Sequence, residues 1–304
     1  MTKKVDAIVV TYNRLDLLKK CLYALLRQTY KLHNIFVIDN NSQDKTLLFL
    51  KELSSKYSKI KVVHLSANIG GAGGFYVGMK EFIEKSKADY AWVMDDDAIP
   101  TPSALTKLMD KTAEIAKLGF LCSNVRWKDN SPAKMNIPQP TSNWNEKVSQ
   151  GLVEVEYASF VAILFPRKVI TDIGLPIKEF FIWGDDVEYT KRITNSGYKG
   201  YLVNDAIIVH EIKQNIGTNI VLEKDKNRIA RYFYARRNTM YTMKKRYNKK
   251  EFTKWVISCF LIEPYKIIRY SRNNRILRLK ASLKGTISGF FFNPPIYKFK
   301  KDNK

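Results

Sequence analysis

The chain has 304 residues, room for one large or two ordinary domains, and 45% of them are hydrophobic, which is typical of a folded protein and excludes a disordered one. Its three cysteines, Cys21, Cys122 and Cys259, have no metal-binding or disulfide spacing, which favours a reducing cytosol. No apolar stretch reaches the roughly 18 residues that a spanning helix needs, and the N-terminal apolar run is too short for a signal peptide.

The net charge of +23 is unevenly distributed along the chain. Residues 213–304 hold 24 Lys and Arg against 5 Asp and Glu, whereas residues 1–212 hold 28 basic and 24 acidic side chains. The first two thirds therefore have the charge balance of an ordinary cytosolic enzyme. The last third is predicted to meet a polyanion.

Strand patterns alternate with helix patterns over the first 100 residues. Strands are predicted at 5–10, 35–38, 60–65 and 90–94, and helices after Asp16, at 46–56 and from about Phe75 to Lys85. This alternation predicts a parallel, doubly wound α/β sheet, which binds ligands at the carboxyl ends of its strands. Polar or glycine-rich clusters follow the strands at 11–14, 39–42, 68–74 and 95–97, so one site along a single edge of the sheet is expected.

The most informative cluster is Asp95-Asp96-Asp97, which directly follows the apolar run 91–94. Three adjacent carboxylates repel one another unless a cation neutralises them. Mg²⁺ or Mn²⁺ held by one or two carboxylates usually keeps substrate phosphates as its other ligands. A solvated acidic loop is the structural alternative. The buried-looking strand before the triplet, in a strongly basic protein, favours a metal and a phosphate.

The segment Asn68-Ile-Gly-Gly-Ala-Gly-Gly has four glycines in five positions. Glycine permits positive φ and a close approach of backbone to a ligand, and a helix opening at Phe75 could direct N–H groups toward an anion. The pattern is neither a dinucleotide fingerprint nor a P-loop. A flexible turn between strand and helix is the alternative.

The middle of the chain is less regular. After a helix near 103–118, residues 119–157 lose clear periodicity and include Trp127 and Trp144, which predicts a long functional or mobile loop whose tryptophans stack on a sugar or anchor packing. Strand character returns at 157–165.

The segment 180–189 carries an aromatic patch into Asp185 and Asp186, predicted in the first turn of a helix. The helix dipole favours acids at that position, and a carboxylate beside an aromatic wall can also act as a general base. Strands predicted at 201–203 and 206–209 end at His210, which is either structural or a ligand of metal or phosphate.

From Arg228 onward the chain is basic and aromatic, with helices predicted at 252–268 and 276–292. The second helix places Ile276, Leu279, Leu283, Ile287 and Phe290 on one face, flanked by Arg275, Arg278, Lys280 and Lys284. This composition is typical of a helix lying on anionic lipid. Single-stranded nucleic acid is the alternative, disfavoured because no RNA-binding motif is present.

Five ordered motifs together resemble glycosyltransferase family 2, and most closely its galactofuranosyltransferase branch. They are Val-Thr-Tyr-Asn-Arg (10–14), Val-Ile-Asp-Asn-Asn-Ser (37–42), Asn-Ile-Gly-Gly-Ala-Gly-Gly (68–74), Met-Asp-Asp-Asp (94–97) and Trp-Gly-Asp-Asp-Val-Glu-Tyr (183–189). The resemblance covers roughly residues 5–240. It implies a GT-A nucleotide-diphospho-sugar transferase fold with a mainly parallel sheet in residues 1–227. The basic helical region 228–304 is then expected to associate with a membrane surface.

The resemblance also implies an activity and a site. The activity is inverting, metal-dependent transfer from UDP-galactofuranose to a hydroxyl of a lipid-linked glycan in cell-surface polysaccharide synthesis. The implied donor-binding residues are Thr11, Arg14, Asp39, Asn41, Asn68, Gly70, Gly71, Asp95 and Asp96. Asp95, Asp97 and His210 would hold Mn²⁺ or Mg²⁺. Asp186 would be the catalytic base, oriented by Asp185, and Trp183 and Phe160 would line the acceptor site.

Several alternatives stay open. The chain is much shorter than the processive mycobacterial-type galactan polymerases and lacks their N-terminal β-domain, which favours formation of a single linkage. A family 2 transferase using UDP-glucose, UDP-galactose or dTDP-rhamnose is the near alternative, and a non-catalytic basic adaptor the distant one. We expect a cytoplasmic protein bound peripherally to the inner face of the plasma membrane, with no nucleic-acid partner and with its oligomeric state open.

Overall fold

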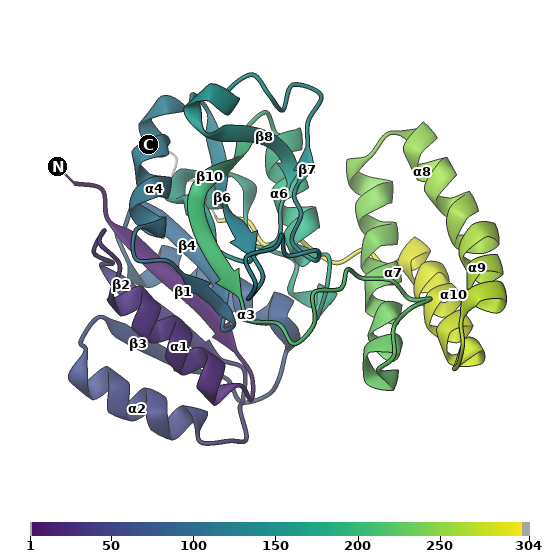
Figure 1. Ribbon diagram of the computed structural model, residues 1–304, viewed down its shortest axis with the longest axis horizontal. Helices are drawn as coiled ribbons and strands as arrows, with labels where there is room; N and C mark the ends of the chain where they lie inside the picture. The colour runs from purple at the N-terminus through teal and green to yellow at the C-terminus, as the bar shows by residue number, and fades with distance from the viewer. Residues whose placement is uncertain (1, 300–304) are drawn as a thin grey trace.

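The computed structural model describes residues 2–299 and shows an α/β domain with a bundle of helices beside it (Figure 1). The strands are β1 (Val5–Thr11), β2 (Asn34–Asp39), β3 (Ile60–His64), β4 (Tyr90–Asp95), β5 (Ala98–Pro100), β6 (Leu118–Arg126), β7 (Gln139–Pro140), β8 (Leu152–Tyr157), β9 (Ile163–Pro166) and β10 (Lys199–His210). The helices of this domain are α1 (Leu15–Leu26), α2 (Thr46–Lys56), α3 (Gly70–Lys85), α4 (Ala104–Lys111), α5 (Arg167–Ile173) and α6 (Asp185–Asn195).

The helical bundle consists of α7 (Lys226–Arg246), α8 (Lys249–Ile257), a π-helical turn (Ser258–Ile262), α9 (Glu263–Tyr270) and α10 (Arg275–Phe291). We call it the helical region. Its long helices α7 and α10 pack closely at two glycines of α10. A Cβ at Gly285 would lie 2.4 Å from the backbone oxygen of Phe233, and a Cβ at Gly289 would lie 2.5 Å from Met240 Cβ, so a larger residue does not fit at either position. Between residues 2 and 299, no helix is both long enough and apolar enough to cross a bilayer.

One mixed sheet runs through the α/β domain in the order β3-β2-β1-β4-β9-β6-β10-β8-β7, with β5 paired to β10. Strands β3, β2, β1 and β4 are mutually parallel, and their register sets Thr11 opposite Asp39 and Val10 opposite Asp95. The polar clusters that follow these strands therefore share one edge of the sheet, as the sequence predicted. Beyond β4 the sheet changes character: β9 is antiparallel to both its neighbours, while β6 and β10 are parallel to each other.

Helices cover both faces of the sheet and give two hydrophobic layers. One layer packs α1, α2 and α4 against side chains such as Val9 and Val37, and the other packs α3, α5 and α6 against side chains such as Ile8 and Ile38. Because alternate residues of a strand point to opposite faces, β1 contributes to both layers and is buried throughout.

Several predicted segments differ in the structure. Residues 152–157 of the expected long loop form β8, and residues 119–126 of the same loop belong to β6 in the interior of the sheet. The first six residues of β6 are all buried, so the strand is covered on both faces and shows no alternation of polar and apolar residues. The strands predicted at 201–203 and 206–209 form the single strand β10, whose register against β6 shifts between Val203 and Ile207.

The glycine-rich segment also differs, because α3 begins at Gly70 rather than near Phe75. Gly74 and Gly78 lie inside the helix and face β1. A Cβ at Gly74 would lie 2.5 Å from Val10 Cγ1, and a Cβ at Gly78 would lie 2.4 Å from Ile8 Cγ2. The close approach of helix to strand explains glycine here, despite a cost of about 1 kcal/mol relative to alanine in a helix.

This packing predicts opposite effects for two glycine substitutions in one helix. Gly78→Ala should destabilise the protein by about 1–3 kcal/mol, because the added methyl overlaps Ile8 in a filled core. Gly71→Ala, where a Cβ would meet nothing within 4 Å, should be neutral or stabilising by up to about 1 kcal/mol. Urea unfolding of both variants without ligand tests this, and equal destabilisation by both would contradict the packing argument.

Candidate active site

The aspartate triplet after β4 meets the end of β1. Thr11 Oγ1 donates a hydrogen bond to Asp96 Oδ2 at 2.7 Å, and Arg14 Nη1 lies 2.7 Å from Asp97 Oδ2 and 3.4 Å from Asp96 Oδ1. Asp96 and Asp97 are each only 3% exposed, whereas half of the Arg14 side chain is accessible. The arginine therefore covers the acids from the solvent side and neutralises part of their charge.

The three carboxyl groups of the triplet differ in ionisation. Burial, together with the charges of Asp97 and Asp96, raises the pKa of Asp95 well above its ordinary value. Burial raises the pKa of Asp96 to about 6, although Arg14 opposes the shift. Burial also disfavours the charged form of Asp97, but hydrogen bonding to His210 and the charge of Arg14 hold its pKa below the ordinary value. Asp97 is therefore the member best suited to hold a cation.

His210, the last residue of β10, supplies a second candidate metal ligand. Its Nε2 lies 3.1 Å from Asp97 Oδ1, and its Nδ1 lies 2.8 Å from Asn136 Oδ1. A ring that carries its proton on Nε2 donates to Asp97 and stabilises the ionised carboxylate. A ring that instead donates Nδ1–H to the Asn136 oxygen turns its Nε2 lone pair toward the carboxylate, which is the usual arrangement for a metal-ligating histidine. In that tautomer Asp97 and His210 would together hold a divalent cation.

The predicted three-residue metal set is only partly assembled. Among residues 2–299, no group of three or more His, Cys, Asp or Glu side chains is arranged to hold a metal ion. Asp97 and His210 are in contact, but no direct contact joins Asp95 to them. Repulsion between carboxylates and the attachment of Arg14 to Asp97 account for this arrangement. Two protein ligands still fit Mn²⁺ or Mg²⁺ when substrate phosphates complete the coordination shell.

The end of β2 places Asp39 in a fixed position. Its side chain is fully buried, Oδ1 accepts a hydrogen bond from the Ser42 N–H at 3.0 Å, and Oδ2 lies 2.8 Å from His64 Nδ1. His64 ends β3 directly opposite Asp39 in the sheet. His64 was not among the predicted site residues, although it is a polar residue at the carboxyl end of a strand, like the residues of the predicted clusters.

Asparagine side chains hold the glycine segment. Asn40 donates to the Gly70 oxygen and accepts from the Ile69 N–H, each at 2.9 Å, and Asn68 Oδ1 accepts from the Gly70 N–H at 2.9 Å. The sequence prediction named Asn41 and not Asn40 as a site residue. Asn41 has a φ of 63° and accepts a hydrogen bond from Gln43. A Cβ on Gly71 would meet no atom within 4 Å, so the segment has an open side for a ligand.

The acidic pair lies in the first turn of α6, as predicted. Burial and the charge of Asp186 raise the pKa of Asp185 to about 8. Burial raises the pKa of Asp186 to about 6, although the backbone N–H groups of Val187 and Phe160 favour its ionised form. At neutral pH the pair therefore holds one proton, on Asp185, and Asp186 is ionised and suited to act as a general base. The charge of Asp185 contributes to the raised pKa of Asp95, so the two acid clusters are close enough to interact.

The two predicted acceptor-site aromatics have different environments. Phe160 is 2% exposed and packs edge-to-face on Phe75 at a centroid distance of 4.9 Å, so its ring is a core residue rather than a surface for an acceptor, which corrects the expectation. Only its backbone N–H is directed to Asp186. Trp183 is partly exposed and packs against Tyr232 of α7 at a centroid distance of 5.2 Å.

A mixed sheet with a parallel half, an acid triplet and a second acid pair define a GT-A glycosyltransferase. The chain belongs to glycosyl transferase family 2, whose sequence profile matches residues 6–174. Its relatives make it galactofuranosyltransferase-like. Galactofuranosyltransferase GlfT1 of Mycobacterium tuberculosis (strain ATCC 25618 / H37Rv) is 28% identical over 225 residues, which cover 69% of this chain and 71% of the relative.

Two further comparisons agree with this class. Glycosyltransferase AglE of Haloferax volcanii is 26% identical over 210 residues, which cover 68% of this chain and 66% of the relative. Among solved structures, GalNAc-T7 with UDP, GalNAc and Mn²⁺ matches with a TM-score of 0.60 at 12% identity. The match covers 79% of this chain and 51% of that one, and at this identity it shows the shared fold alone.

The ionisation of the acidic pair predicts a pH dependence of stability. The native state holds the pKa of Asp185 at about 8, above the ordinary value of roughly 4, so it binds more protons than the unfolded state between these values. Its contribution to stability is full below about pH 4 and is lost as the pH rises toward 8. Asp185→Asn should therefore gain stability relative to wild type as the pH rises from 5 to 8. Urea unfolding at three pH values measures this, with Asp110→Asn on the exposed face of α4 as control. A pH-independent difference would contradict it.

Proposed function

We propose that this chain is a metal-dependent, inverting galactofuranosyltransferase that moves galactofuranose from UDP-galactofuranose to a hydroxyl of a lipid-linked glycan. The observation that carries the proposal is the contact of Asp97 with His210 beside the end of β4, together with an acidic pair on α6 close enough for Asp185 to act on the pKa of Asp95. Similarity to GlfT1, a galactofuranosyltransferase, favours this donor sugar over the alternatives.

The residues at the ends of β1, β2 and β4 suit a nucleotide diphosphate. Arg14 has a half-exposed side chain, so its guanidinium can turn from the carboxylates to a diphosphate, which it recognises through paired N–H donors. Asp39 is held by Ser42 and His64 and, in this proposal, would meet the nucleoside. Asp97 and His210 would hold Mn²⁺ or Mg²⁺, which supplies positive charge to the departing diphosphate.

The acidic pair suits the acceptor side of the reaction. Asp186 takes the proton of the acceptor hydroxyl while the hydroxyl oxygen bonds to the anomeric carbon and the bond from that carbon to UDP breaks. A single displacement of this kind inverts the anomeric centre. Asp185 stays protonated at neutral pH, so it adds no second negative charge beside the base.

Replacing the base separates catalysis from donor binding. Asp186→Asn should lower kcat by at least about 100-fold, the usual contribution of a positioned base, because the amide cannot accept the proton. UDP affinity should stay within about twofold, because the residues proposed to bind the nucleotide lie at the ends of β1, β2 and β4, whereas Asp186 lies on α6. UDP release with UDP-galactofuranose, Mn²⁺ and a glycolipid acceptor measures kcat, and calorimetry measures UDP binding. Wild-type turnover in the variant would remove Asp186 from the mechanism.

Release of UDP, or of dTDP from dTDP-rhamnose, decides the donor. UDP-galactofuranose should be turned over faster than UDP-galactose, UDP-glucose and dTDP-rhamnose presented at equal concentration. A clear preference for one of the other three would replace the donor assignment and leave the family membership intact. Asp110→Asn serves as the matched carboxylate control for Asp186→Asn.

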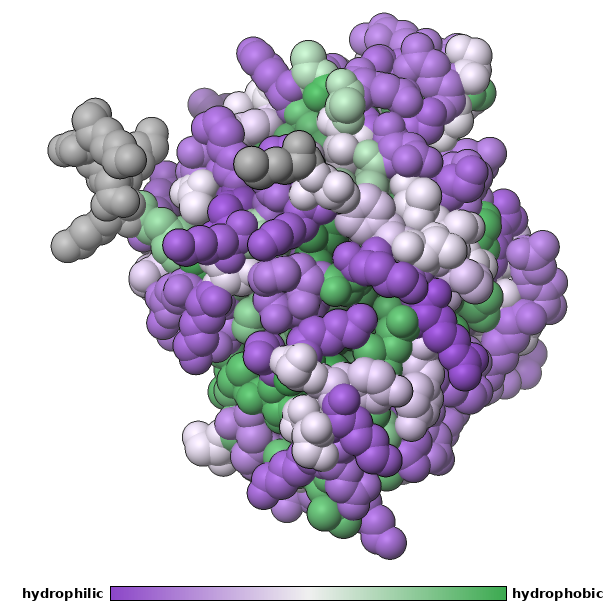
Figure 2. Space-filling model, turned by 90° about the vertical axis from the view of Figure 1, so that its left-hand side faces the viewer, coloured by the Kyte–Doolittle hydropathy of each residue, from purple (hydrophilic) through white to green (hydrophobic). Residues whose placement is uncertain are grey.

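The helical region supports placing the protein at a membrane surface. Of the exposed large hydrophobic side chains within residues 2–299, eleven lie between Ile257 and Phe291. The face of the molecule that carries α1, α2 and α4 is by contrast mostly hydrophilic, with apolar surface only in narrow strips (Figure 2). The apolar surface is thus concentrated in the part of the chain with the largest excess of positive charge.

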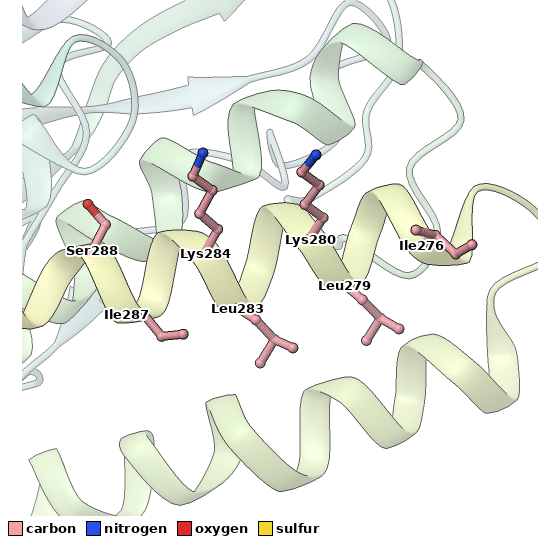
Figure 3. Close-up of a pocket in the computed structure, with 7 residues that line it drawn as sticks. All are labelled: Ile276, Leu279, Lys280, Leu283, Lys284, Ile287 and Ser288. Atoms are coloured by element: carbon pink, nitrogen blue, oxygen red, sulfur yellow. The ribbon is translucent and has the colours of Figure 1, made fainter.

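An apolar groove runs along α10. Ile276, Leu279, Leu283 and Ile287 line a shallow groove of about 590 Å³, and Lys280 and Lys284 point away from the apolar row (Figure 3). This matches the predicted amphipathic face. One predicted cation is not available to lipid: Arg278 is 1% exposed and donates to the backbone oxygens of Ile220 and Glu223.

Membrane association can be tested without disturbing the fold. Ile276→Asp changes a side chain that is 82% exposed and should reduce sedimentation with anionic vesicles, because it places a charge at the lipid contact. Leu48→Asp, at a 59% exposed position on α2, should have no effect. Binding of the wild type should weaken as salt rises. Equal sedimentation of both variants with phosphatidylglycerol vesicles would contradict a contact through α10.

A further inference from the structure

We propose that Arg237 and Asn238 of α7 position the acidic pair by holding the loop that precedes it, residues 179–184, which we call the acid-pair loop. The catalytic part of this inference rests on the proposed role of Asp186 as the base. It gives a second role to the basic, aromatic segment of α7, which the sequence analysis assigned to a polyanion.

The acid-pair loop has an unfavourable backbone. Phe181, Trp183 and Gly184 all have positive φ, of 63°, 65° and 88°. Left-handed backbone is disfavoured for aromatic residues, and such conformations persist only where surrounding structure imposes them. Gly184 is the residue immediately before α6, so the course of the loop sets where Asp185 and Asp186 begin.

The side chain of Asn238 supplies the main restraint. It is fully buried, and its Nδ2 donates to the backbone oxygens of Phe180 at 2.9 Å, Ile182 at 3.2 Å and Trp183 at 2.8 Å. Three carbonyl groups of one short loop thus converge on a single amide. Buried carbonyls outside regular structure need such partners, so the amide favours this loop conformation over others.

Arg237 adds a second restraint from the same turn of α7. Its Nη2 donates to the Glu179 oxygen at 2.6 Å and lies 3.3 Å from the Phe180 oxygen. Its guanidinium also stacks 4.0 Å from the ring centre of Phe292, just after α10. The arginine is therefore committed to the interior of the protein rather than to lipid or nucleic acid.

The opposite side of the loop rests on the donor-binding segment. The Phe181 oxygen accepts a hydrogen bond from the Ala72 N–H at 3.2 Å, and a Cβ on Gly70 would lie 2.0 Å from that oxygen. The acid-pair loop is thus fixed between α7 and the first turn of α3. This contact joins the candidate base to the glycine segment, which Asn40 ties to β2.

The far end of α7 holds α6 as well. Arg246 Nε donates to Glu188 Oε1 at 2.8 Å, and Glu188 is fully buried and also pairs with Arg192 at 2.8 Å. Helix α7 therefore contacts the acid-bearing helix through this ion pair, and it contacts the entry loop through Arg237, Asn238 and ring contacts such as Trp183 with Tyr232. A shift of α7 would move Asp185 and Asp186 relative to the sheet.

The test replaces the amide of Asn238 and follows catalysis, UDP binding and local opening separately. Asn238→Ala and the isosteric Asn238→Asp both remove the donor and should lower kcat by about 10- to 100-fold, the effect of a small misplacement of a reacting group. UDP affinity should stay within about twofold. Amide hydrogen exchange should accelerate in residues 179–186 and stay unchanged in residues 8–14, which belong to the donor side.

Thr242→Ala is the matched control, because Thr242 is buried on the same helix and donates only to the Asn238 backbone oxygen. It should leave kcat and loop exchange unchanged. Should the Asn238 variants not fold, Arg237→Gln provides the same test with a milder change, and a smaller fall in kcat with faster exchange in 179–186 is expected.

Three outcomes in the Asn238 variants would overturn the inference. Amide exchange in residues 179–186 could stay unchanged, or it could accelerate while kcat stays unchanged. In the third outcome, kcat and UDP affinity fall together and exchange accelerates throughout the protein. If the wild type transfers no sugar from any donor, the proposed function fails. The exchange comparison then still decides whether Asn238 holds the loop.

Discussion

The crowding of carboxylates at one edge of a sheet is the constraint on which the rest of this structure depends. Asp95, Asp96 and Asp97 repel one another when ionised. Folded protein around them removes the water that would screen this repulsion. The repulsion is relieved by the Arg14 guanidinium, by the contact of Asp97 with His210 and by the raised pKa values of Asp95 and Asp96, and an added cation would relieve it further.

This arrangement explains why the two acid clusters differ in role. The triplet meets Arg14 and His210, so the charge on Asp97 is stabilised and available to a metal. Within residues 2–299 no ion pair joins a cation to the acidic pair, and its ionisation is set by burial and by the first turn of α6. One cluster is thus suited to hold a positive ion, and the other to accept a proton.

The helical region combines two kinds of surface on the same few helices. Its outer side exposes Ile276, Ile287 and Phe291 to solvent, whereas the inner side of α7 donates hydrogen bonds to the loop before α6. The amino-acid composition therefore changes between residues 227 and 228, but the segments on the two sides of this boundary are in contact. In the proposed mechanism α7 helps to position the acidic pair, and α10 packs along α7.

Sequence alone determined the chemistry of the parallel half, because β1 to β4 are short apolar runs whose carboxyl ends must meet, and it therefore identified the aspartates and Arg14. Tertiary structure decided which neighbours they meet. His64 contacts Asp39 on the adjacent strand, and Asn40 contacts the start of α3. Phe160 is a core residue, and β6 gave no periodic signal because both its faces are buried. The hold of Asn238 on residues 180–183 joins segments 55 or more residues apart, and no local pattern records such a contact.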